Sequence, residues 1–264
     1  MELMSITLAT CLATGVALAG VAARALTPGA GLAAAVVGTA IGVGTGWPGL
    51  VGLGAFFVSS SVVSRLTERF QPAWVDAKSN RRDPWQVWAN GGVAAVGGLL
   101  GLIGHEQVAL WIVLPSLAAA AADTWATSLG ALGRGDPIHV WRRVRVPKGT
   151  SGGVSLIGTV GGMAGAGIVA LLPCLLGVPS VLCQAAFLLG ILGMVADSIL
   201  GGTVQGRFEC PECGLPSERT RHRCGAPTRL AGGIPWLGND GVNLLATLLA
   251  GLAGWGWWAV CCSG

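Results

Sequence analysis

Long apolar segments recur along the whole chain and limit what it can fold into. Several are long enough to cross the roughly 30 Å hydrocarbon core of a bilayer as helices rising about 1.5 Å per residue. Hydrophobic residues make up 52% of the 264 residues and charged residues only 11%, against about 25% in soluble domains. An open sheet would leave unpaired edge groups in lipid. The sequence therefore predicts an all-α, polytopic transmembrane helical bundle that forms a single integral membrane domain over residues 1–264.

Eight apolar stretches predict membrane-spanning helices. The second and third are joined by "GTGWPG", whose Pro48 and glycines indicate a tight turn or a re-entrant hairpin, so the bundle has seven or eight spans. The 44 glycines would weaken helices in water, but between membrane helices small residues allow close backbone packing. The predicted spans cover residues 3–23, 29–46, 48–64, 86–104, 107–130, 152–173, 179–202 and 240–260.

The basic residues fall only in alternate loops. With eight spans, all 16 Lys and Arg residues lie in the first, third, fifth and seventh loops, and the positive-inside rule makes that side cytoplasmic. Both termini then lie on the opposite side, where "GWGWWAV" suits an aromatic belt. The net charge of +4 therefore reports topology and does not indicate nucleic-acid binding. We expect an integral protein of the inner or plasma membrane whose functional face is cytoplasmic.

Two aspartates lie inside predicted spans. Asp123, in "AADTWATSLG", is near the cytoplasmic end of the fifth span, and Asp197, in "ADSILGG", is at the equivalent depth of the seventh. Ionisable residues within a membrane are costly unless they face a polar cavity or a partner, so they indicate a functional site. The alternative is a structural lock in which each aspartate pairs with a nearby arginine. Because both point to one compartment, we favour the functional interpretation.

A glycine-rich turn follows a lysine in "PKGTSGGVSLIGTVGG". Lys148 precedes residues 149–153 at the start of the sixth predicted span. A turn of this kind that opens a helix presents free backbone N–H groups at the positive end of the helix dipole, where phosphate oxygens bind. It differs from the Walker pattern G-x-x-x-x-G-K-[ST], because here the lysine comes first. The alternative is a flexible helix cap that packs through glycine.

Polar side chains gather at two further helix entrances. In "DAKSNRRDPWQVWANGG", Gln86 and Asn90 lie four residues apart and so on one helix face. A basic loop on anionic lipid would explain the arginines that precede them, but not these two amides. Amides and a carboxylate also surround the last span, where Asn239 suits a helix cap. This second group comprises Gln205, Asn239, Asp240 and Asn243.

The stretch 205–236, predicted to be a cytoplasmic loop between the last two spans, contains "CPECGLPSERTRHRCG". Cys210 and Cys213 have C-x-x-C spacing, and His222 and Cys224 follow, which gives four donors suited to tetrahedral structural zinc. The alternative is a set of reduced thiols without a metal, since disulfides are rare in the cytosol. We interpret three other cysteines as small buried hydrophobic residues: Cys11, Cys174 and Cys183.

An ordered set of motifs resembles a known family. Over about residues 65–250, "KSNRRDPWQVWANGG", "AADTWATSLG", "PKGTSGGVSLIGTVGG", "ADSILGGTVQG" and "NDGVNLL" resemble the family that includes mammalian transmembrane protein 19 and the plant phytyl-phosphate kinase. The resemblance implies a membrane-embedded kinase that adds a second phosphate to a prenyl monophosphate, using a nucleoside triphosphate such as CTP or ATP. The chain is also distantly similar to dolichol and phytol kinases. Those have a glutamate inside the turn, which "PKGTSGG" lacks, so a prenyl alcohol is the less favoured acceptor.

The chemistry of the acceptor leads to the same preference. A prenyl alcohol needs a base to become a nucleophile, whereas a monophosphate with a second pKa near 6 is already an anion. Phosphoryl transfer then requires mainly positioning and charge neutralisation, commonly through Mg²⁺. We assign Asp123 and Asp197 to Mg²⁺ and Lys148 to the donor phosphates. Weaker candidates for binding the acceptor phosphate are Lys78, Arg81 and Arg142. The predicted binding residues are Lys78, Arg81, Asn90, Thr127, Gly149, Thr150, Ser151, Gly152, Gly153, Ser155, Gln205, Asp240 and Asn243.

Two other functions fit part of the pattern. A small-solute or ion transporter also has intramembrane aspartates and interrupted spans, but its route would need polar residues in both halves of the bilayer. A noncatalytic scaffold organised by the zinc loop would depend on Cys210 and not on Asp123. The expected partners are a prenyl phosphate lipid, a nucleotide and the membrane. Prenyl chain length, the choice between CTP and ATP, and oligomeric state stay open.

Overall fold

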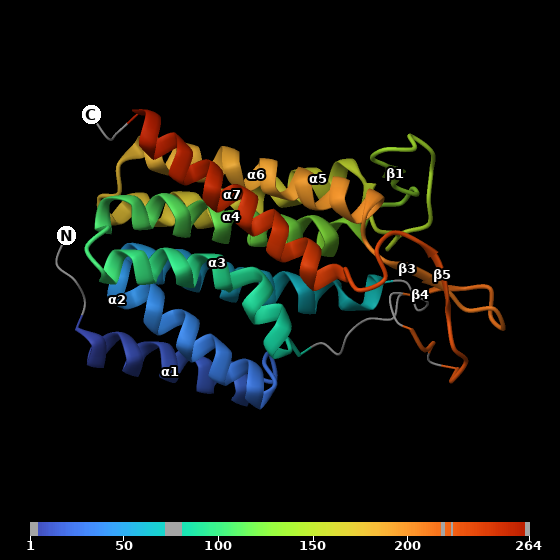
Figure 1. The fold of residues 1–264 in the computed structure, drawn as a ribbon, viewed down its shortest axis with the longest axis horizontal. Coiled ribbons are helices and arrows are strands. Elements are labelled where there is room, and N and C mark those ends of the chain that lie inside the picture. Colours follow the sequence, from blue (N-terminus) through green and yellow to red (C-terminus); the bar gives the residue numbers. More distant parts are fainter. Residues whose placement is uncertain (1–4, 72–80, 218–219, 223, 262–264) are drawn as a thin grey trace.

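The fold is a bundle of helices that lie side by side along the long axis of the molecule (Figure 1). The computed structural model describes residues 5–71, 81–217, 220–222 and 224–261. Two short 3-10 helices, η1 (Glu68–Phe70) and η2 (Leu172–Leu176), extend α2 and α5. The α-helices are α1 (Ile6–Ala22), α2 (Pro28–Thr67), α3 (Pro84–Leu102), α4 (Glu106–Gly130), α5 (Leu156–Leu171), α6 (Ser180–Thr203) and α7 (Asn239–Cys261).

The short strands lie at one end of the bundle, while the start of α1 and the end of α7 lie at the other (Figure 1). Strand β1 (Ile138–His139) pairs antiparallel with β2 (Gly153–Val154) in the loop between α4 and α5. Strands β3 (Arg207–Glu209), β4 (Pro216–Ser217) and β5 (Arg229–Gly232) form an antiparallel sheet in the order β4-β3-β5. We call this end of the molecule the loop end.

Helix α2 is a hairpin of two helical arms. Gly46 interrupts it with φ 63° and ψ −151°, a conformation that favours glycine. A Cβ on Gly42 would lie 3.1 Å from the Leu50 side chain, and one on Gly38 would lie 3.5 Å from Leu53. Residues eight apart in a continuous helix are separated by about 12 Å, so the chain must reverse. The two arms correspond to the second and third predicted spans, and the tight turn predicted from "GTGWPG" is confirmed.

Helix α4 forms the centre of the core and packs against α2, α3, α5, α6 and α7. Its residues 108–122 are all buried. Small residues permit this packing, as predicted: a Cβ on Gly190 of α6 would lie 2.7 Å from the Ala118 side chain, and one on Gly193 would lie 2.5 Å from Ala119. Between α3 and the first arm of α2, a Cβ on Gly98 would lie 2.8 Å from the Cα of Ile41 and closer still to the carbonyl group of Ala40. Small residues therefore bring the backbones of these helices close together.

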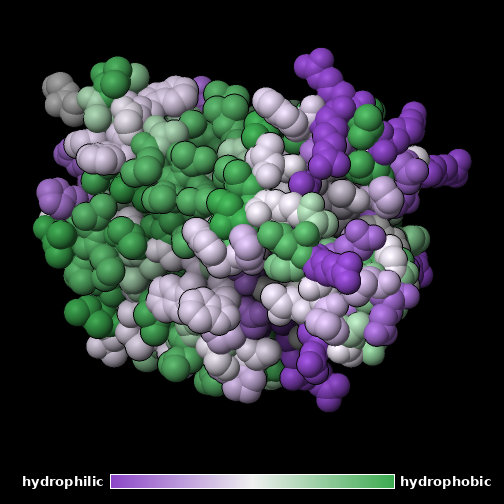
Figure 2. Space-filling view, turned by 45° about the vertical axis from the view of Figure 1, so that its right-hand side comes forward, coloured by the Kyte–Doolittle hydropathy of each residue, from purple (hydrophilic) through white to green (hydrophobic). Residues whose placement is uncertain are grey.

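The surface agrees with a membrane location. Five helices, α2, α4, α5 with η2, α6 and α7, are long and apolar enough to cross a bilayer, while α1 is shorter at 17 residues. Figure 2 shows apolar side chains over much of the helical part and hydrophilic ones gathered toward the loop end. The prediction of an all-α polytopic membrane fold is confirmed.

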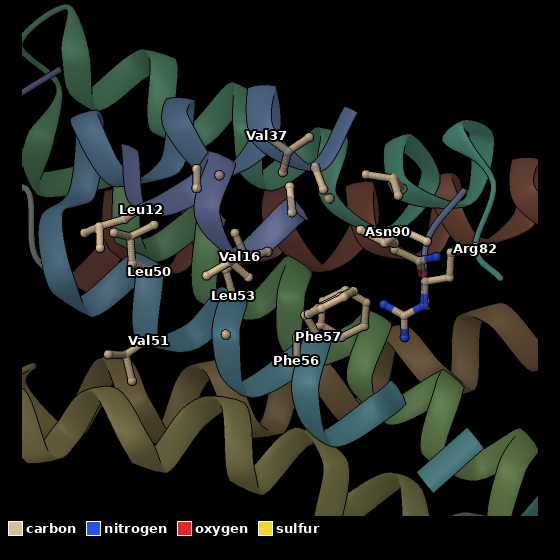
Figure 3. Close-up of a pocket in the computed structure, with 18 of the residues that line it drawn as sticks. Leu12, Val16, Val37, Leu50, Val51, Leu53, Phe56, Phe57, Arg82 and Asn90 are labelled. Carbon is tan, nitrogen blue, oxygen red and sulfur yellow. The ribbon is translucent and has the colours of Figure 1, made fainter. Parts of the chain in front are cut away.

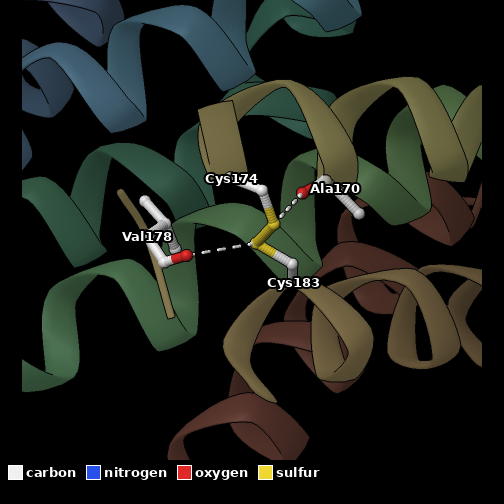
Figure 4. The surroundings of a disulfide bond; sticks show 4 residues. All are labelled: Ala170, Cys174, Val178 and Cys183. Atoms are coloured by element: carbon white, nitrogen blue, oxygen red, sulfur yellow. Dashed lines mark hydrogen bonds between the residues drawn. A yellow bond between two sulfur atoms is a disulfide. The ribbon is translucent and has the colours of Figure 1, made fainter. Parts of the chain in front are cut away.

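Cys174 and Cys183 form a disulfide that joins η2 to α6 (Figure 4). Their Cα atoms are 6.5 Å apart. Cys183 is buried, as predicted, but the interpretation of these two residues as simple hydrophobic side chains was wrong, because the turn between the helices brings their sulfur atoms together. Cys11 is not buried, since it is exposed on α1. The disulfide follows α5, which starts beside β2, so it lies at the end of the bundle away from the strands.

Candidate functional site

A large polar cavity of about 1040 Å³ opens at the loop end. Residues of α2, α3, α4, α5, α6 and α7 line it, together with the loop between α4 and α5. The chain segments after α1, α2, α4 and α6 all contribute to its lining, so the loops predicted to carry the basic residues meet here. The predicted site residues that line this polar cavity are Asn90, Asp123, Thr127, Lys148, Gly149, Thr150, Ser151, Gly152, Gly153, Ser155, Gln205, Asp197 and Asn243.

Asp123 of α4 and Asp197 of α6 are neighbours in the polar cavity. Their carboxyl groups lie within hydrogen-bonding reach of each other. The close contact of α6 with α4 through Gly190 and Gly193 brings the two helices together one to two turns before these residues. Two adjacent carboxyl groups cannot both ionise cheaply unless a cation lies beside them; otherwise one proton stays on the pair. Their oxygens are the hard ligands that Mg²⁺ prefers, so the pair has the right chemistry to hold this ion.

Lys148 reaches the same cavity from the loop between α4 and α5. Its ammonium group donates hydrogen bonds to the backbone carbonyls of Ala131, at 3.3 Å, and Gly133, just beyond the C-terminus of α4. These bonds hold the side chain at the cavity wall. Because an ammonium group has three donors, these two bonds leave one N–H of this cavity-lining residue unused.

The glycine-rich turn packs against the end of α6. Gly152 has φ +79°, and a Cβ there would lie 2.8 Å from the Gly202 nitrogen and closer still to the Gly202 Cα. Gly149 also has a positive φ, of 81°. Glycine at these positions therefore lets the turn lie directly on the α6 backbone, near Asp197.

The turn does not open a helix, so that part of the prediction was wrong. Gly153 belongs to β2, and α5 begins only at Leu156, with the Ser155 hydroxyl accepting a hydrogen bond of 3.1 Å from the Gly158 N–H. The helical segment predicted at 152–173 therefore begins later and runs from Leu156 to Leu176. The N–H groups of Thr150 and Gly153 donate within the loop. In the part of the chain that the structure describes, the N–H groups of Gly149 and Gly152 have no backbone acceptor.

His139 supports the turn from behind. It is buried, and its Nδ1 accepts hydrogen bonds from the backbone N–H groups of Trp141, at 3.3 Å, and Arg142, at 3.2 Å. A Cβ on Gly202 would lie 3.0 Å from the imidazole ring. Burial, followed by the charges of Arg142 and Arg207, lowers the pKa of His139. The ring is therefore held neutral with its proton on Nε2, a role that its sequence context did not indicate.

Some predicted residues lie elsewhere. Arg81 is exposed and lines neither this cavity nor the apolar cavity described below, and Arg142 is exposed outside them as well. Asp240, in the first turn of α7, is not a lining residue, whereas the neighbouring Asn239 is. Lys78 lies outside the described residues.

The second arm of α2, together with η1 that extends it, contributes polar residues that the sequence reasoning missed. They follow the spacing i, i+3, i+4 and i+7 and so share one helix face. This polar stripe in an otherwise apolar segment was the signal that would have found them. The residues are Ser61, Ser64, Arg65 and Glu68.

Four metal-ligand side chains come together in the segment between α6 and α7. The ligand atoms of Cys210, Cys213, His222 and Cys224 all lie within 4.8 Å of one another. The sulfur of Cys224 is 3.6 Å from that of Cys210 and 3.1 Å from Nδ1 of His222. Burial would raise the pKa of Cys210, but backbone hydrogen bonds at Cys213 and Glu212 and the two other thiols outweigh it, so this pKa is lowered. The cluster has the donor types and the convergence of a zinc site.

Comparison with known proteins identifies the family. Similar proteins include an uncharacterized membrane protein of Methanocaldococcus jannaschii, 30% identical over 212 residues (79% of this chain and 76% of that protein). An uncharacterized membrane protein of Synechocystis is 28% identical over 224 residues (81% and 75%). Protein PGR of Arabidopsis thaliana is 27% identical over 222 residues (74% and 76%). No solved structure matches significantly. The family described as integral membrane protein DUF92 matches residues 11–251, and the chain belongs to this family.

Proposed function

We propose that the polar cavity is the active site of a membrane-embedded kinase. It transfers a phosphoryl group from a nucleoside triphosphate, CTP or ATP, to a prenyl or phytyl monophosphate and so produces the diphosphate. The observation that carries this proposal is the adjacency of Asp123 and Asp197 in one polar cavity with Lys148. The resemblance of the cavity motifs to the phytyl-phosphate kinase family points to the same reaction.

Each group at the cavity has a part in phosphoryl transfer. Asp123 and Asp197 would hold Mg²⁺, which would supply the positive charge that neutralises the donor phosphates. Lys148 and the free N–H groups of Gly149 and Gly152 hold the donor phosphate oxygens by hydrogen bonds. The cavity thus combines a possible metal site with hydrogen-bond donors for a triphosphate, which is most of what this reaction requires.

The transfer itself needs no strong base. An oxygen of the acceptor monophosphate, already an anion because its second pKa is near 6, forms a bond to the γ-phosphorus of the donor. The bond between that phosphorus and the β,γ-bridging oxygen breaks, and the nucleoside diphosphate leaves with the bonding pair. The acceptor becomes a diphosphate, so atoms and charge balance without a further reactant.

The orientation of the chain gives the site access to cytoplasmic nucleotides. The basic loops and the cluster of free cysteines Cys210, Cys213 and Cys224 are at the loop end, while the Cys174–Cys183 disulfide is at the other. Positive charge marks the cytoplasmic side, and disulfides persist in oxidising compartments but rarely in the cytosol. These two independent features favour the same orientation, in which the loop end is cytoplasmic.

The packing of α4 favours a kinase over a transporter. The polar cavity takes its α4 lining only from Asp123 onward. Before it, residues 108–122 are buried and apolar except for Ser116, whose hydroxyl bonds to its own helix at Val113. The described residues of the central helix therefore offer no polar route toward the opposite end of the bundle.

Phosphoryl transfer by the purified protein tests the proposal. The protein in detergent, supplied with Mg²⁺, geranylgeranyl or phytyl monophosphate and γ-labelled CTP or ATP, should form labelled prenyl diphosphate. Asp123→Asn and Asp197→Asn should each lower kcat by about 10²-fold or more, the range for loss of a fixed charge-stabilising group. Asp136→Asn is the matched control, because Asp136 is an exposed aspartate in the loop between α4 and α5 and does not line the polar cavity. Failure to form a diphosphate with either nucleotide, from folded protein, would refute the kinase assignment.

We also propose that the Cys210, Cys213, His222 and Cys224 cluster holds structural Zn²⁺. Nδ1 of His222 lies 3.1 Å from the Cys224 sulfur, so this ring nitrogen converges with the thiols as a ligand would. The sheet around the cluster links α6 to α7 through hydrogen bonds from Gly206 to Leu237 and from Ile234 to Val204. Zinc would stabilise this small sheet, whose apolar core is slight. Elemental analysis should find about one zinc per chain, lost in Cys210→Ser and kept in Cys11→Ser; absence of zinc from the unmodified protein would contradict the assignment.

A further inference from the structure

A second, apolar cavity lies between α1, the two arms of α2 and the start of α3. Its volume is about 240 Å³. Figure 3 shows Leu12, Val16, Leu50 and Leu53 along its length and Arg82 and Asn90 at one end. Val16 and Trp47 line it and are about half exposed, at 53% and 54%. The apolar cavity therefore has an open side on the surface that faces the bilayer.

The apolar and polar cavities adjoin. Arg82, Gln86 and Asn90 line both of them. A molecule with an apolar chain and a charged head can thus place its chain in one cavity and its head at the edge of the other, on the side where Asp123 and Asp197 lie.

Arg82 is held rigidly at this junction. Its backbone N–H donates to Ala25 at 2.9 Å, and its carbonyl accepts from Thr27 at 3.0 Å, which ties it to the connection between α1 and α2. Its guanidinium lies 5.0 Å from the centre of the Phe56 ring and 5.6 Å from that of Phe57. Within the described residues, no carboxylate or other hydrogen-bond acceptor reaches this side chain. Burial lowers the pKa of Arg82 to about 10, so the group stays charged at neutral pH.

Gln86 adds a neutral donor beside this charge. Its side-chain oxygen accepts a hydrogen bond of 3.0 Å from the Asp83 N–H, in the capping box that starts α3. The amide nitrogen of Gln86 is then left as a donor at the edge of both cavities. Asn90 donates at 2.8 Å to the Gln86 carbonyl and so is fixed on the same helix face. A half-buried cation with a fixed donor beside it suits an anion, and an apolar chain attached to that anion would fill the adjoining space.

We propose that the apolar cavity receives the hydrocarbon chain of a lipid monophosphate, and that Arg82 and Gln86 hold its phosphate at the edge of the polar cavity. This inference rests on the proposed kinase function and identifies its acceptor site. The hydrocarbon chain comes from the bilayer, which is as apolar as the cavity. Moving that hydrocarbon chain from lipid into the cavity therefore gives little affinity. Recognition therefore comes mainly from the phosphate, and the cavity serves to bring that phosphate to the aspartates without exposing the chain to water.

Filling the apolar cavity tests the position of the chain. A Cβ on Gly54 has no atom within 4 Å although Gly54 lines this cavity, so Gly54→Phe adds a side chain there without a clash at Cβ. Gly15→Phe is the matched control, since its Cβ is equally unobstructed but lies outside both cavities. We expect Gly54→Phe to raise KM for geranylgeranyl monophosphate by about 10-fold or more. The KM of this variant for a five-carbon prenyl monophosphate should be unchanged, because the short chain does not reach the filled space. Gly15→Phe should change the KM of neither lipid. Equal KM values for Gly54→Phe and Gly15→Phe would overturn the proposal.

Removing the charge tests the position of the phosphate. Arg82→Gln should weaken binding of prenyl monophosphates of either length by about 30-fold or more, as expected when one partner of a desolvated charge pair is removed. Arg81→Gln is the control, because that exposed neighbour lines neither cavity and should bind both lipids normally. Unchanged binding by Arg82→Gln would contradict the assignment of the head group.

A binding experiment separates this proposal from the kinase proposal. Geranylgeranyl monophosphate with a diazirine at the chain end is photolysed in the catalytically impaired Asp123→Asn protein, and the labelled peptides are mapped by mass spectrometry. Labels on residues 12–17 or 47–57, lost in Gly54→Phe, support the lipid site even if no nucleotide is turned over. Labels confined to other helices overturn the lipid site even if kinase activity is found.

Discussion

Replacing Gly152 with alanine tests how the glycine-rich turn is held beside Asp197. Two effects add at this position. The positive φ of 79° costs an alanine about 1 kcal/mol or somewhat more. The new Cβ would also lie 2.8 Å from the Gly202 nitrogen, where ordinary contact begins at 3.4 Å, so the turn must retreat by about 0.6 Å or more. A displacement of about 1 Å in a phosphate-positioning group costs roughly 10²-fold in rate, so we expect kcat to fall about 10- to 100-fold.

Gly177→Ala is the matched control for this change. Gly177 has nearly the same backbone conformation, with φ +83°, but no atom lies within 4 Å of its Cβ. Thermal unfolding of both variants and phosphoryl transfer to geranylgeranyl monophosphate provide the comparison. Gly177→Ala should show only the backbone cost, a decrease of about 2–4 °C in Tm, with normal kcat. If Gly152→Ala matches Gly177→Ala in both Tm and kcat, the contact of the turn with α6 does not position the site.

Three further changes have defined outcomes. Because the folded-state pKa of His139 is lowered from 6.5, protonation favours the unfolded state, and stability should decrease as pH falls below about 6.5; His139→Asn, which keeps a non-titrating acceptor, should show a smaller decrease in Tm between pH 7 and pH 5. Removing bound zinc with a chelator should lower the Tm of the unmodified protein but not that of Cys210→Ser, and equal shifts would argue against a structural metal. Cys174→Ala should lower the free energy of unfolding by about 2–3 kcal/mol. A membrane-impermeant maleimide added to intact cells should label Cys174 and Cys183 only after the disulfide is reduced. Labelling of these two cysteines from the cytoplasmic side alone would reverse the proposed orientation.

The membrane fold and the two aspartates of the polar cavity were predictable from the sequence, because each carries a local signal. Apolar stretches of sufficient length predict helices whatever surrounds them. An aspartate within such a stretch, as at Asp123 and Asp197, is costly in lipid and so indicates a polar cavity before any contact is known. The C-x-x-C spacing of Cys210 and Cys213 is likewise a local pattern, and the structure brings His222 and Cys224 to it.

Local patterns failed where the outcome depends on distant contacts. The stretch "RRD" does not reveal which arginine faces the cavities. Arg82 does so because its backbone pairs with the connection between α1 and α2, which turns the adjacent Arg81 outward. The glycine-rich turn was expected to open a helix, but the pairing of β2 with β1 separates it from α5.

The sequence by itself determined that this chain forms membrane helices with the basic side chains at one end, because the cost of placing charge in lipid acts on each segment independently. Only the tertiary structure decided that the first helix, the α2 hairpin and α3 enclose an apolar cavity, and that Arg82 joins it to the aspartates. Such a cavity is the space left between helices after their side chains have packed, and packing is a property of all the helices together.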